Sequence, residues 1–490
     1  MSAKKGFTRL DCIVLCIILV IAGGLRVYKI NNPIADWHSW RQADTAAVGR
    51  NFVEGSFDLL RPRYDDFSNV QTGQYNPEGY RMVEFPLYNA TFAALYKAFP
   101  AMSLEVYGRL VSVIFSLIII SVIYILLLYE TSRTAALYGA MTYAILPFYI
   151  YFSRVVLPET TAIGFIFLAI ATLYFWSSSL KRITQSLLYV MAVLFAALAL
   201  LVKPTTGFYL LVLGIIFLKK YRTRIFVKPW GYILLALAII PFFAWRLWIQ
   251  EFPAGVPSYE WLITSVNTAS GPQNIFMKPA FFRWIFYERI LILISGGWAG
   301  LFLLLGVIRN TKKSGLILTS FGISALLYLF TFQGGNVQHD YYQTIILPAL
   351  AIFTGLGIHS LYEAKAVFLH HIPLTVMIAV IFGFSWVISY STVKGYYGYS
   401  EQLINTARVI DTITSKDALI VTDSTGDTTL LYNAHRRGMP AVSESLPNLK
   451  QRGIDYFVTG NGVIGEKVQE EYKGLFKLIF KNNDVYIFKL

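Results

Sequence analysis

Long apolar segments alternate with short polar segments along the first 391 residues of the chain. The first apolar segment runs from about Asp11 to Tyr28, and the last from about Ile372 to Ser391. The third runs from about Ala135 to Tyr151, and the eighth from about Ile290 to Ile308. A helix of about 20 apolar residues crosses a hydrocarbon core roughly 30 Å thick, and a helix also satisfies its own backbone hydrogen bonds, as lipid requires. The pattern therefore predicts about eleven membrane-spanning helices.

The composition supports this class of protein. The chain has 490 residues, of which 56% are apolar and 14% charged, whereas about 25% are charged in a typical soluble protein. The net charge of +14 would favour a nucleic-acid partner in a soluble protein. Here much of the excess lies in short loops such as residues 219–228, so we interpret it as a signal of orientation and expect no nucleic acid. The predicted fold class is a polytopic α-helical membrane protein.

The positive-inside rule orients the predicted helices. Basic loops follow the second, fourth, sixth, eighth and tenth spans, on the same side as the N-terminus. The polar intervals 30–99 and 250–288 then lie on the opposite, extracytoplasmic side. The first apolar segment is long and lacks a small-residue cleavage site, so we expect a retained anchor. The chain is predicted to be a multi-pass protein of the plasma (inner) membrane with its functional residues outside.

The pattern changes after residue 391. Short apolar runs bounded by turn residues replace the long segments, which indicates strands and short helices. The chain thus divides into a membrane domain, residues 1–391, and a small extracytoplasmic α/β domain, residues 392–490. Strands are expected at Ala418–Thr422, Ile454–Val458, Lys477–Phe480 and Val485–Phe488, and short helices at Thr428–His435 and Glu444–Gln451.

The interval Asp36–Pro86 gathers carboxylates, arginines, a histidine and aromatic residues between two apolar segments. Transfer of a sugar from a lipid phosphate needs a base that activates the acceptor, and a carboxylate at the membrane surface can serve. Asp44 and Asp36 are the candidates. We expect Asp44 just before an interfacial helix at residues 45–53, where a helix N-terminus favours an anion. The alternative is that Asp44 only caps this helix.

Several cations predicted on the same face could hold the donor phosphate, which suits the planar fork of arginine. Lys203 could instead be a lysine that reaches from a span end to the interface. The arginines at 61 and 63 could instead contact lipid headgroups. The candidate phosphate ligands are Arg41, Arg61, Arg63, Lys203 and His339.

Other residues of this face could bind the acceptor or line the cavity. Glu84 could equally form a salt bridge with Arg81 or Arg109, and Glu159 could simply be a charge at a helix N-terminus. His339 and Asp340 are adjacent and no second histidine is near, so we predict no metal ligand set and no certain cofactor, and leave a divalent metal open. The candidate acceptor or cavity residues are His38, Glu84, Arg154, Glu159, Tyr341 and Tyr342.

The segment Asp423–Asp427 follows a predicted strand and precedes a predicted helix. It could be an anion-binding loop or an ordinary strand-to-helix turn.

Short sequence motifs along residues 10–390 carry a family resemblance. They are Trp40–Ala46 with Arg50, Leu60–Arg63, Glu84–Tyr88, Tyr107–Leu110, Arg154–Glu159, Lys203–Pro204, and His339–Gln343 before Leu347–Leu350. In this order the chain resembles the GT-C superfamily of membrane glycosyltransferases that use polyprenyl-phosphate sugars. The nearest likenesses are protein O-mannosyltransferases, lipid A aminoarabinose transferases and galacturonosyltransferase-like bacterial enzymes.

The resemblance implies a catalytic aspartate on the first outer loop, interfacial helices and a cavity open to the membrane. It also implies an inverting transfer from an undecaprenyl- or dolichyl-type phosphate sugar. The chain departs from the family in two places. Arg41-Gln42 stand where some members carry Asp-Glu, which leaves the choice between Asp36 and Asp44 open. Glu84 stands where a basic residue often precedes the Pro-Leu-Tyr segment, so the acceptor site can differ.

We therefore expect a glycosyltransferase that moves a hexose or pentose from a polyprenyl-phosphate carrier to an extracytoplasmic lipid, glycan or protein. The polar residues of distant segments are expected to meet in one pocket. One alternative is a transporter or flippase of lipid-linked saccharides, which predicts charged or Gly/Pro-broken positions deep within paired spans. Another is a structural membrane protein whose outer domain binds a partner.

Overall fold

The computed structural model describes residues 6–257, 275, 278–313, 315–364 and 370–490. Part of the predicted outer interval 250–288 therefore lies outside the described residues. The chain forms two compact units. The first unit consists of residues 1–30, 109–245 and 259–396, and the second of residues 31–108, 246–258 and 397–490. The predicted division into a membrane domain, residues 1–391, and an extracytoplasmic domain, residues 392–490, stays a prediction.

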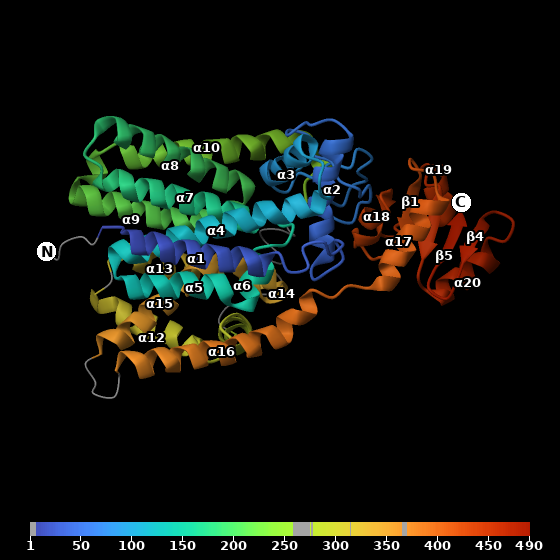
Figure 1. Ribbon diagram of the computed structural model, residues 1–490. Coiled ribbons are helices and arrows are strands. Elements are labelled where there is room, and N and C mark those ends of the chain that lie inside the picture. The colour runs from blue at the N-terminus through green and yellow to red at the C-terminus, as the bar shows by residue number, and fades with distance from the viewer. Residues whose placement is uncertain (1–5, 258–274, 276–277, 314, 365–369) are drawn as a thin grey trace. The chain divides into compact units, whose positions relative to one another are not determined.

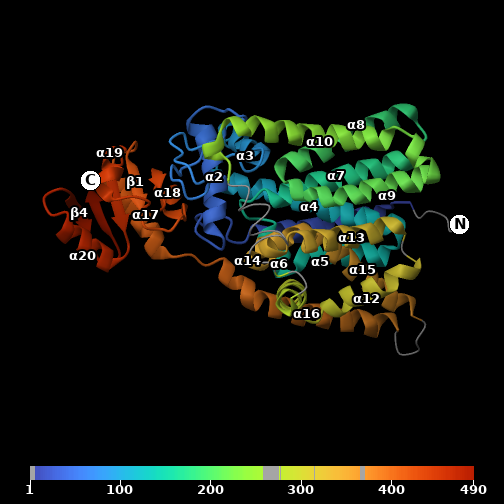
Figure 2. The same ribbon diagram turned by 180° about the vertical axis from the view of Figure 1, so that it is seen from behind.

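The first unit is a bundle of helices (Figures 1 and 2). α7 packs along α8, and α15 packs against both α5 and α12. The longer helices are α1 (Arg9–Arg26), α4 (Leu104–Glu130), α5 (Arg133–Ile145), α7 (Glu159–Ser178), α8 (Arg182–Val202), α9 (Leu210–Tyr221), α10 (Trp230–Trp248), α12 (Gly300–Lys313), α13 (Leu316–Thr331), α15 (Leu347–Glu363) and α16 (His371–Tyr396). Short helical pieces connect them: α6 (Pro147–Phe152), η1 (Pro204–Tyr209), η2 (Arg222–Val227), α11 (Pro279–Phe282), the π-helix η6 (Arg283–Ile294), α14 (Gln333–Gln338) and η7 (Asp340–Ile346). The short pieces η3 (Ile249–Glu251) and η4 (Pro253–Gly255) belong to the second unit.

Within the described residues, six helical segments are long and apolar enough to cross a membrane, so the predicted number of about eleven is not confirmed. Two predicted spans are interrupted for a local reason. The span predicted at 135–151 divides at Leu146, whose extended backbone precedes Pro147, because a residue before proline avoids the helical region. The span predicted at 290–308 is broken at Gly296 and Gly297, whose φ angles are +62° and +75°. The six segments are 104–130, 159–178, 182–202, 230–251, 340–363 and 371–413.

In the second unit, two helices of the first polar interval pack closely. They are α2 (Ser39–Glu54) and α3 (Leu87–Ala98). A Cβ atom on Gly49 would lie 2.0 Å from a ring carbon of Phe92. The contact therefore requires glycine at position 49, because a methyl group there would overlap the ring.

The C-terminal part of the second unit holds a five-stranded sheet. The strand order is β2-β1-β3-β5-β4, with β1 parallel to β2 and β3, and β5 antiparallel to β3 and β4. All four predicted strands and both predicted short helices are present, whereas β2, α17 and α20 were not predicted. The elements are β1 (Leu419–Thr422), β2 (Arg437–Met439), β3 (Tyr456–Thr459), β4 (Lys477–Lys481), β5 (Tyr486–Lys489), α17 (Glu401–Ile413), α18 (Thr429–Asn433), α19 (Leu446–Gln451) and α20 (Gly462–Glu471).

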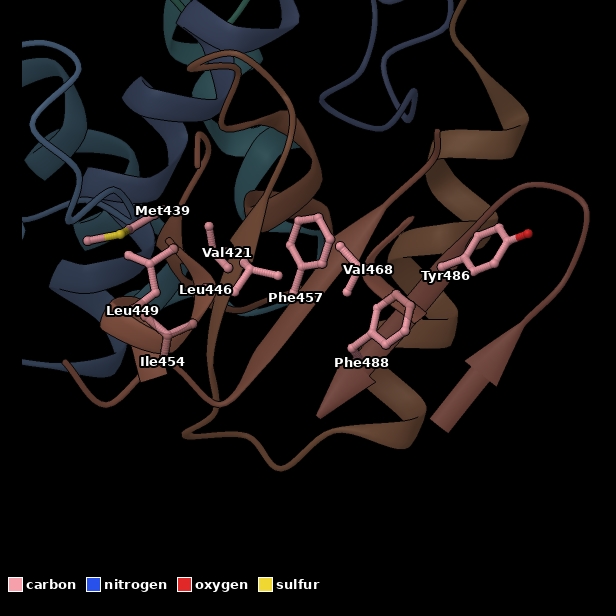
Figure 3. Packing of buried hydrophobic residues seen from close by; sticks show 9 residues of the cluster. All are labelled: Val421, Met439, Leu446, Leu449, Ile454, Phe457, Val468, Tyr486 and Phe488. Carbon is pink, nitrogen blue, oxygen red and sulfur yellow. The ribbon is translucent and has the colours of Figure 1, made fainter. Parts of the chain in front are cut away.

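Alternate residues of the strands face opposite sides of this sheet. Val421 and Phe457 pack with Leu449 and other residues in one buried cluster, whose nine side chains are drawn in Figure 3. Ile420 and Val458 belong to a second cluster with residues of α17 and α18. The sheet thus has an apolar core on each face.

The first polar interval pairs with the outer edge of β2. The backbone N–H of Phe67 donates to the carbonyl of Gly438 at 2.7 Å, and the N–H of Gly438 donates to the carbonyl of Asp65 at 2.9 Å. An edge strand with unpaired backbone groups is a site of unwanted association. The loop at Asp65–Phe67 covers this edge and ties the first polar interval to the C-terminal sheet.

Candidate active site

Asp44 lies inside α2, not before it. The helix begins at Ser39, and its N-cap residue His38 has a φ of +57° and makes no side-chain capping bond. The prediction that this helix starts at residue 45 is therefore wrong. The two interpretations that placed Asp44 at the helix N-terminus, as an anion favoured there or as a cap, are wrong as well. The apolar spacing becomes regular only near Ala47, but buried residues such as Ala43 continue the helix toward its start.

The carboxylate of Asp44 is buried and held by three donors, two from the first polar interval and one from the C-terminal part of the second unit. Its Oδ2 is 2.8 Å from Nη2 of Arg81 and 3.3 Å from the amide nitrogen of Gln71. Its Oδ1 accepts a hydrogen bond of 2.7 Å from the hydroxyl of Thr428, just before α18. Only 1% of Asp44 is exposed. Asp44 therefore joins α2, the first polar interval and the C-terminal α/β part of the second unit.

Asp36 is also buried, and a neutral amide holds it. Nε2 of Gln42 donates to Oδ1 of Asp36 at 2.7 Å and to the carbonyl of Trp37 at 3.0 Å. Gln42 is fully buried. It orients the aspartate six residues earlier.

Arg41 and Glu84 form an ion pair at 2.5 Å, and their side chains are 7% and 13% exposed. The alternative expected from the sequence, a salt bridge of Glu84 with Arg81 or Arg109, stays a prediction. The two residues were given separate roles from the sequence, phosphate binding and acceptor binding. Those roles stay predictions, but the structure brings the two side chains together.

The other candidates of the first polar interval are more exposed. Arg61 pairs with Asp58 at 3.3 Å, and Arg63 pairs with Glu78 at 2.6 Å. The guanidinium of Arg61 also lies 5.8 Å from the ring centre of Trp248. Side chains that are 40–48% exposed contribute little through such pairs. The ring of His38 lies 5.2 Å from that of Trp37.

In the first unit, Lys203 pairs with Glu159 at 2.8 Å, and the two side chains are 15% and 3% exposed. Glu159 is the first residue of α7, so it does lie at a helix N-terminus, as the alternative interpretation requires. Arg154 is fully buried and donates to the backbone carbonyls of Tyr28 and Lys29.

A second cluster of the first unit surrounds Asp340. Its carboxylate accepts a 2.6 Å hydrogen bond from the hydroxyl of Tyr396 and lies 3.3 Å from Nη1 of Arg289. The rings of Tyr341 and Tyr342 stack beside His339, with centres 5.5 and 6.0 Å from the imidazole. Sequence reasoning missed Arg289 and Tyr396, and only the acidic residue next to His339 could have signalled this cluster.

Two further carboxylates lie near Asp44: Asp66, which was missed from the sequence, and Asp427, the last residue of the segment Asp423–Asp427 noted above. Burial, with a smaller contribution from the Asp44 carboxylate, raises the pKa of Asp66 to about 6, although hydrogen bonds from Ser68 and the charge of Arg81 oppose the shift. Burial likewise raises the pKa of Asp427. Arg81 therefore lies in a region of negative charge. Among the described residues, no three His, Cys, Asp or Glu side chains are arranged to hold a metal ion, and the question of a divalent metal stays open.

The structure thus forms separate groups of candidate residues within each unit. In the second unit it joins Asp36 to Gln42, Arg41 to Glu84, and Asp44 to Arg81. In the first unit it joins Lys203 to Glu159. The expectation that all of them share one pocket stays a prediction.

Comparison with known proteins gives the fold a family context. Residues 86–248 match the family described as dolichyl-phosphate-mannose-protein mannosyltransferase. A search of curated proteins finds no match. Among solved structures, ArnT from Cupriavidus metallidurans bound to undecaprenyl phosphate is 14% identical with a TM-score of 0.62, over 99% of this chain and 98% of that one. The chain has the GT-C fold.

Other GT-C structures are similar over most of this chain. Archaeal oligosaccharyltransferase AglB from Archaeoglobus fulgidus, in complex with an inhibitory peptide and a dolichol-phosphate, is 12% identical with a TM-score of 0.55, over 92% of this chain and 70% of that one. Arabinofuranosyltransferase AftD from Mycobacteria is 13% identical with a TM-score of 0.60, over 100% of this chain and 42% of that one. The resemblance to GT-C glycosyltransferases expected from the sequence is confirmed. The family match begins at residue 86, so Asp36 and Asp44 lie outside it.

Proposed function

We propose that this protein is a membrane glycosyltransferase that moves a monosaccharide from a polyprenyl-phosphate carrier to an acceptor outside the plasma membrane. The observation that carries the proposal is the likeness to ArnT bound to undecaprenyl phosphate, which extends over nearly the whole of both chains. The family match at residues 86–248 supports the same class of activity. The six long apolar helical segments suit a donor that is itself a membrane lipid.

Asp36 is our proposed base. A base needs an oxygen that can take up a proton. Asp44 is ion-paired with Arg81, and its protonation would leave a buried arginine without its counter-charge. Asp36 is buried and accepts a hydrogen bond from the amide of Gln42, which orients its carboxylate. We therefore assign catalysis to Asp36 and the positioning of α2 to Asp44.

In the proposed reaction, Asp36 takes the proton of an acceptor hydroxyl or amine. The freed lone pair attacks the anomeric carbon, and the bond from that carbon to the phosphate oxygen breaks. Its electron pair leaves with the polyprenyl phosphate. Attack from the face opposite the phosphate inverts the anomeric configuration.

Arg41 and Lys203 are the proposed phosphate ligands with the best support. Each is largely buried and held by a carboxylate, Glu84 for Arg41 and Glu159 for Lys203. A phosphate group can take the place of a carboxylate on a charged donor, because both are anionic acceptors. Arg61 and Arg63 are exposed and paired with acidic neighbours, which favours contact with the surroundings over a donor site.

The test compares variants of the purified full-length protein in lipid nanodiscs with a radiolabelled polyprenyl-phosphate sugar and candidate acceptors. Asp36→Asn should lower the transfer rate by about 10²- to 10⁴-fold, the usual contribution of a general base, and keep the wild-type thermal transition. Asp484→Asn, in an exposed turn before β5, is the matched control and should transfer at the wild-type rate. An unchanged rate for Asp36→Asn would reject Asp36 as the base.

A further inference from the structure

A polar cavity lies within the second unit, and its lining includes neither Asp36 nor Asp44. Its volume is about 320 Å³, at the lower end of the roughly 300–1,000 Å³ typical of small-molecule sites. Its walls come from three parts of the sequence: α2 with the loop residue Asp65, the segment 416–419 that leads into β1, and the turn His435–Arg437 that leads into β2. The cavity thus forms where the first polar interval meets the C-terminal sheet.

Two of the lining residues, Arg50 and Asp65, are fixed and balance each other's charge. Nη2 of Arg50 lies 2.5 Å from Oδ2 of Asp65, and Nη1 donates to the carbonyl of Tyr432 at 2.7 Å. The same guanidinium lies 4.5 Å from the ring centre of Tyr432. Arg50 and Asp65 are both buried. These contacts use the Arg50 charge internally and leave ligand binding to the other lining residues.

Arg437 supplies a donor that the described protein atoms do not use. One terminal nitrogen donates to the backbone carbonyl of Glu78 at 3.3 Å, and the guanidinium lies 4.4 Å from the ring centre of Phe67. Its Nε is buried, and it has no hydrogen-bond partner among the described residues. Buried polar groups are nearly always hydrogen-bonded. Arg437 also lines the cavity, where its guanidinium can donate to a charged ligand oxygen.

The rim combines charges of both signs. Lys416 is exposed and forms no ion pair within the part of the chain that the structure describes. Glu54, Asp417 and His435 are also exposed and line the same cavity. The lysine can bind an acidic group, and the carboxylates can accept from hydroxyl groups. A bare anion would be repelled by the carboxylates, whereas a sugar acid offers a partner to each set.

We propose that this cavity binds a saccharide unit that carries an acidic group, with the acid on Arg437 and Lys416 and the hydroxyls on Glu54 and Asp417. The saccharide is part of the acceptor, so the proposal rests on the function proposed above. The acidic group can be a carboxylate or a phosphate, because both present charged oxygens to guanidinium and ammonium groups.

The experiment measures direct binding to the full-length protein in nanodiscs by isothermal titration calorimetry. The probes are a disaccharide with one uronate, the same type of disaccharide with one phosphate ester, and a neutral disaccharide. Either acidic probe should bind saturably and at least about tenfold more tightly than the neutral probe. Arg437→Gln and Lys416→Gln should each weaken that binding by about tenfold, as expected for a lost charge-assisted hydrogen bond.

Lys467→Gln, an exposed lysine on α20 outside the cavity, is the matched control and should bind as the wild type does. Because Lys416 is exposed, Lys416→Gln should fold normally. The test therefore stays decisive. Equal binding of acidic and neutral probes, or unchanged binding by both cavity variants, would overturn the proposal. Asp36→Asn should bind the acidic probe normally while losing transfer, so a failure of the transferase assay and a failure of the cavity give different results.

Discussion

The ion pair between Asp44 and Arg81 should decide whether α2 keeps its place in the second unit. Asp44→Asn keeps the shape of the side chain and removes its charge, which leaves Arg81 buried without its ion-pair partner. Arg81→Met does the converse and leaves Asp44 beside Asp66 and Asp427. The double variant removes both charges and should recover much of the lost stability.

The magnitude follows from burial and distance. The two side chains are 1% and 9% exposed, and the charged atoms are 2.8 Å apart. Removal of one partner of a buried pair costs about 3–5 kcal/mol, whereas replacement of both by neutral groups is often close to neutral. Arg81→Met should be the more damaging single change, because Arg81 also lowers the pKa of Asp66 and its loss leaves three carboxylates together. The two single changes should therefore not be additive.

Hydrogen exchange measured by mass spectrometry on peptides of α2 reports the local opening free energy directly. Each single variant should speed exchange of the Ser39–Glu54 amides by about 100-fold or more, and the double variant should exchange much closer to the wild-type rate. Peptides of α15 in the first unit serve as an internal control and should not change. Unchanged exchange in both single variants, or a double variant with the summed effect, would refute this account of Asp44.

Three further results are expected. Because the folded-state pKa of Asp66 is raised to about 6 from 3.8, the folded state binds more protons, so stability should fall as the pH rises from about 4 to about 6. Asp66→Asn should remove this slope in thermal unfolding scans and gain about 3 kcal/mol at neutral pH; a persistent slope would contradict the assignment. Gly49→Ala should destabilise the contact of α2 with Phe92 by about 1–3 kcal/mol, whereas Gly214→Ala, with open space around it, should not; equal thermal midpoints for the two variants would oppose this. Lys203→Gln should raise the KM for the donor in steady-state kinetics, because the proposed phosphate ligand loses its charge, and an unchanged KM would exclude that role.

The strength of the local signal explains which elements could be predicted. The C-terminal strands were predicted because each is a short apolar run bounded by turn residues, as at Val485–Phe488 after the turn at residues 482–484. β2 was missed because Arg437–Met439 is only three residues long and carries arginine and glycine. Its identity as a strand comes from its pairing with β1 and with the loop at Asp65–Phe67, which no short sequence window contains.

The candidate residues likewise divide into features that a short stretch of sequence signals and contacts that only the fold brings together. Sequence reasoning selected Arg41, Glu84, Lys203 and Glu159 individually from their charge and position. The two ion pairs that join them connect residues 43 and 44 positions apart, and spacing alone does not give such contacts. The Thr428 bond to Asp44 is a still longer connection, across 384 positions. It could not be found from the motifs of either segment.

The most direct test of the proposed function is the chemical identity of the product. The full-length protein in nanodiscs is incubated with a polyprenyl-phosphate sugar and an acceptor, and the products are examined by mass spectrometry and by NMR of the anomeric proton. We expect a new glycosidic bond of inverted configuration, with one polyprenyl phosphate released for each sugar transferred. Movement of the intact lipid-linked sugar across a sealed bilayer, with no new glycosidic bond formed with any acceptor offered, would contradict the account.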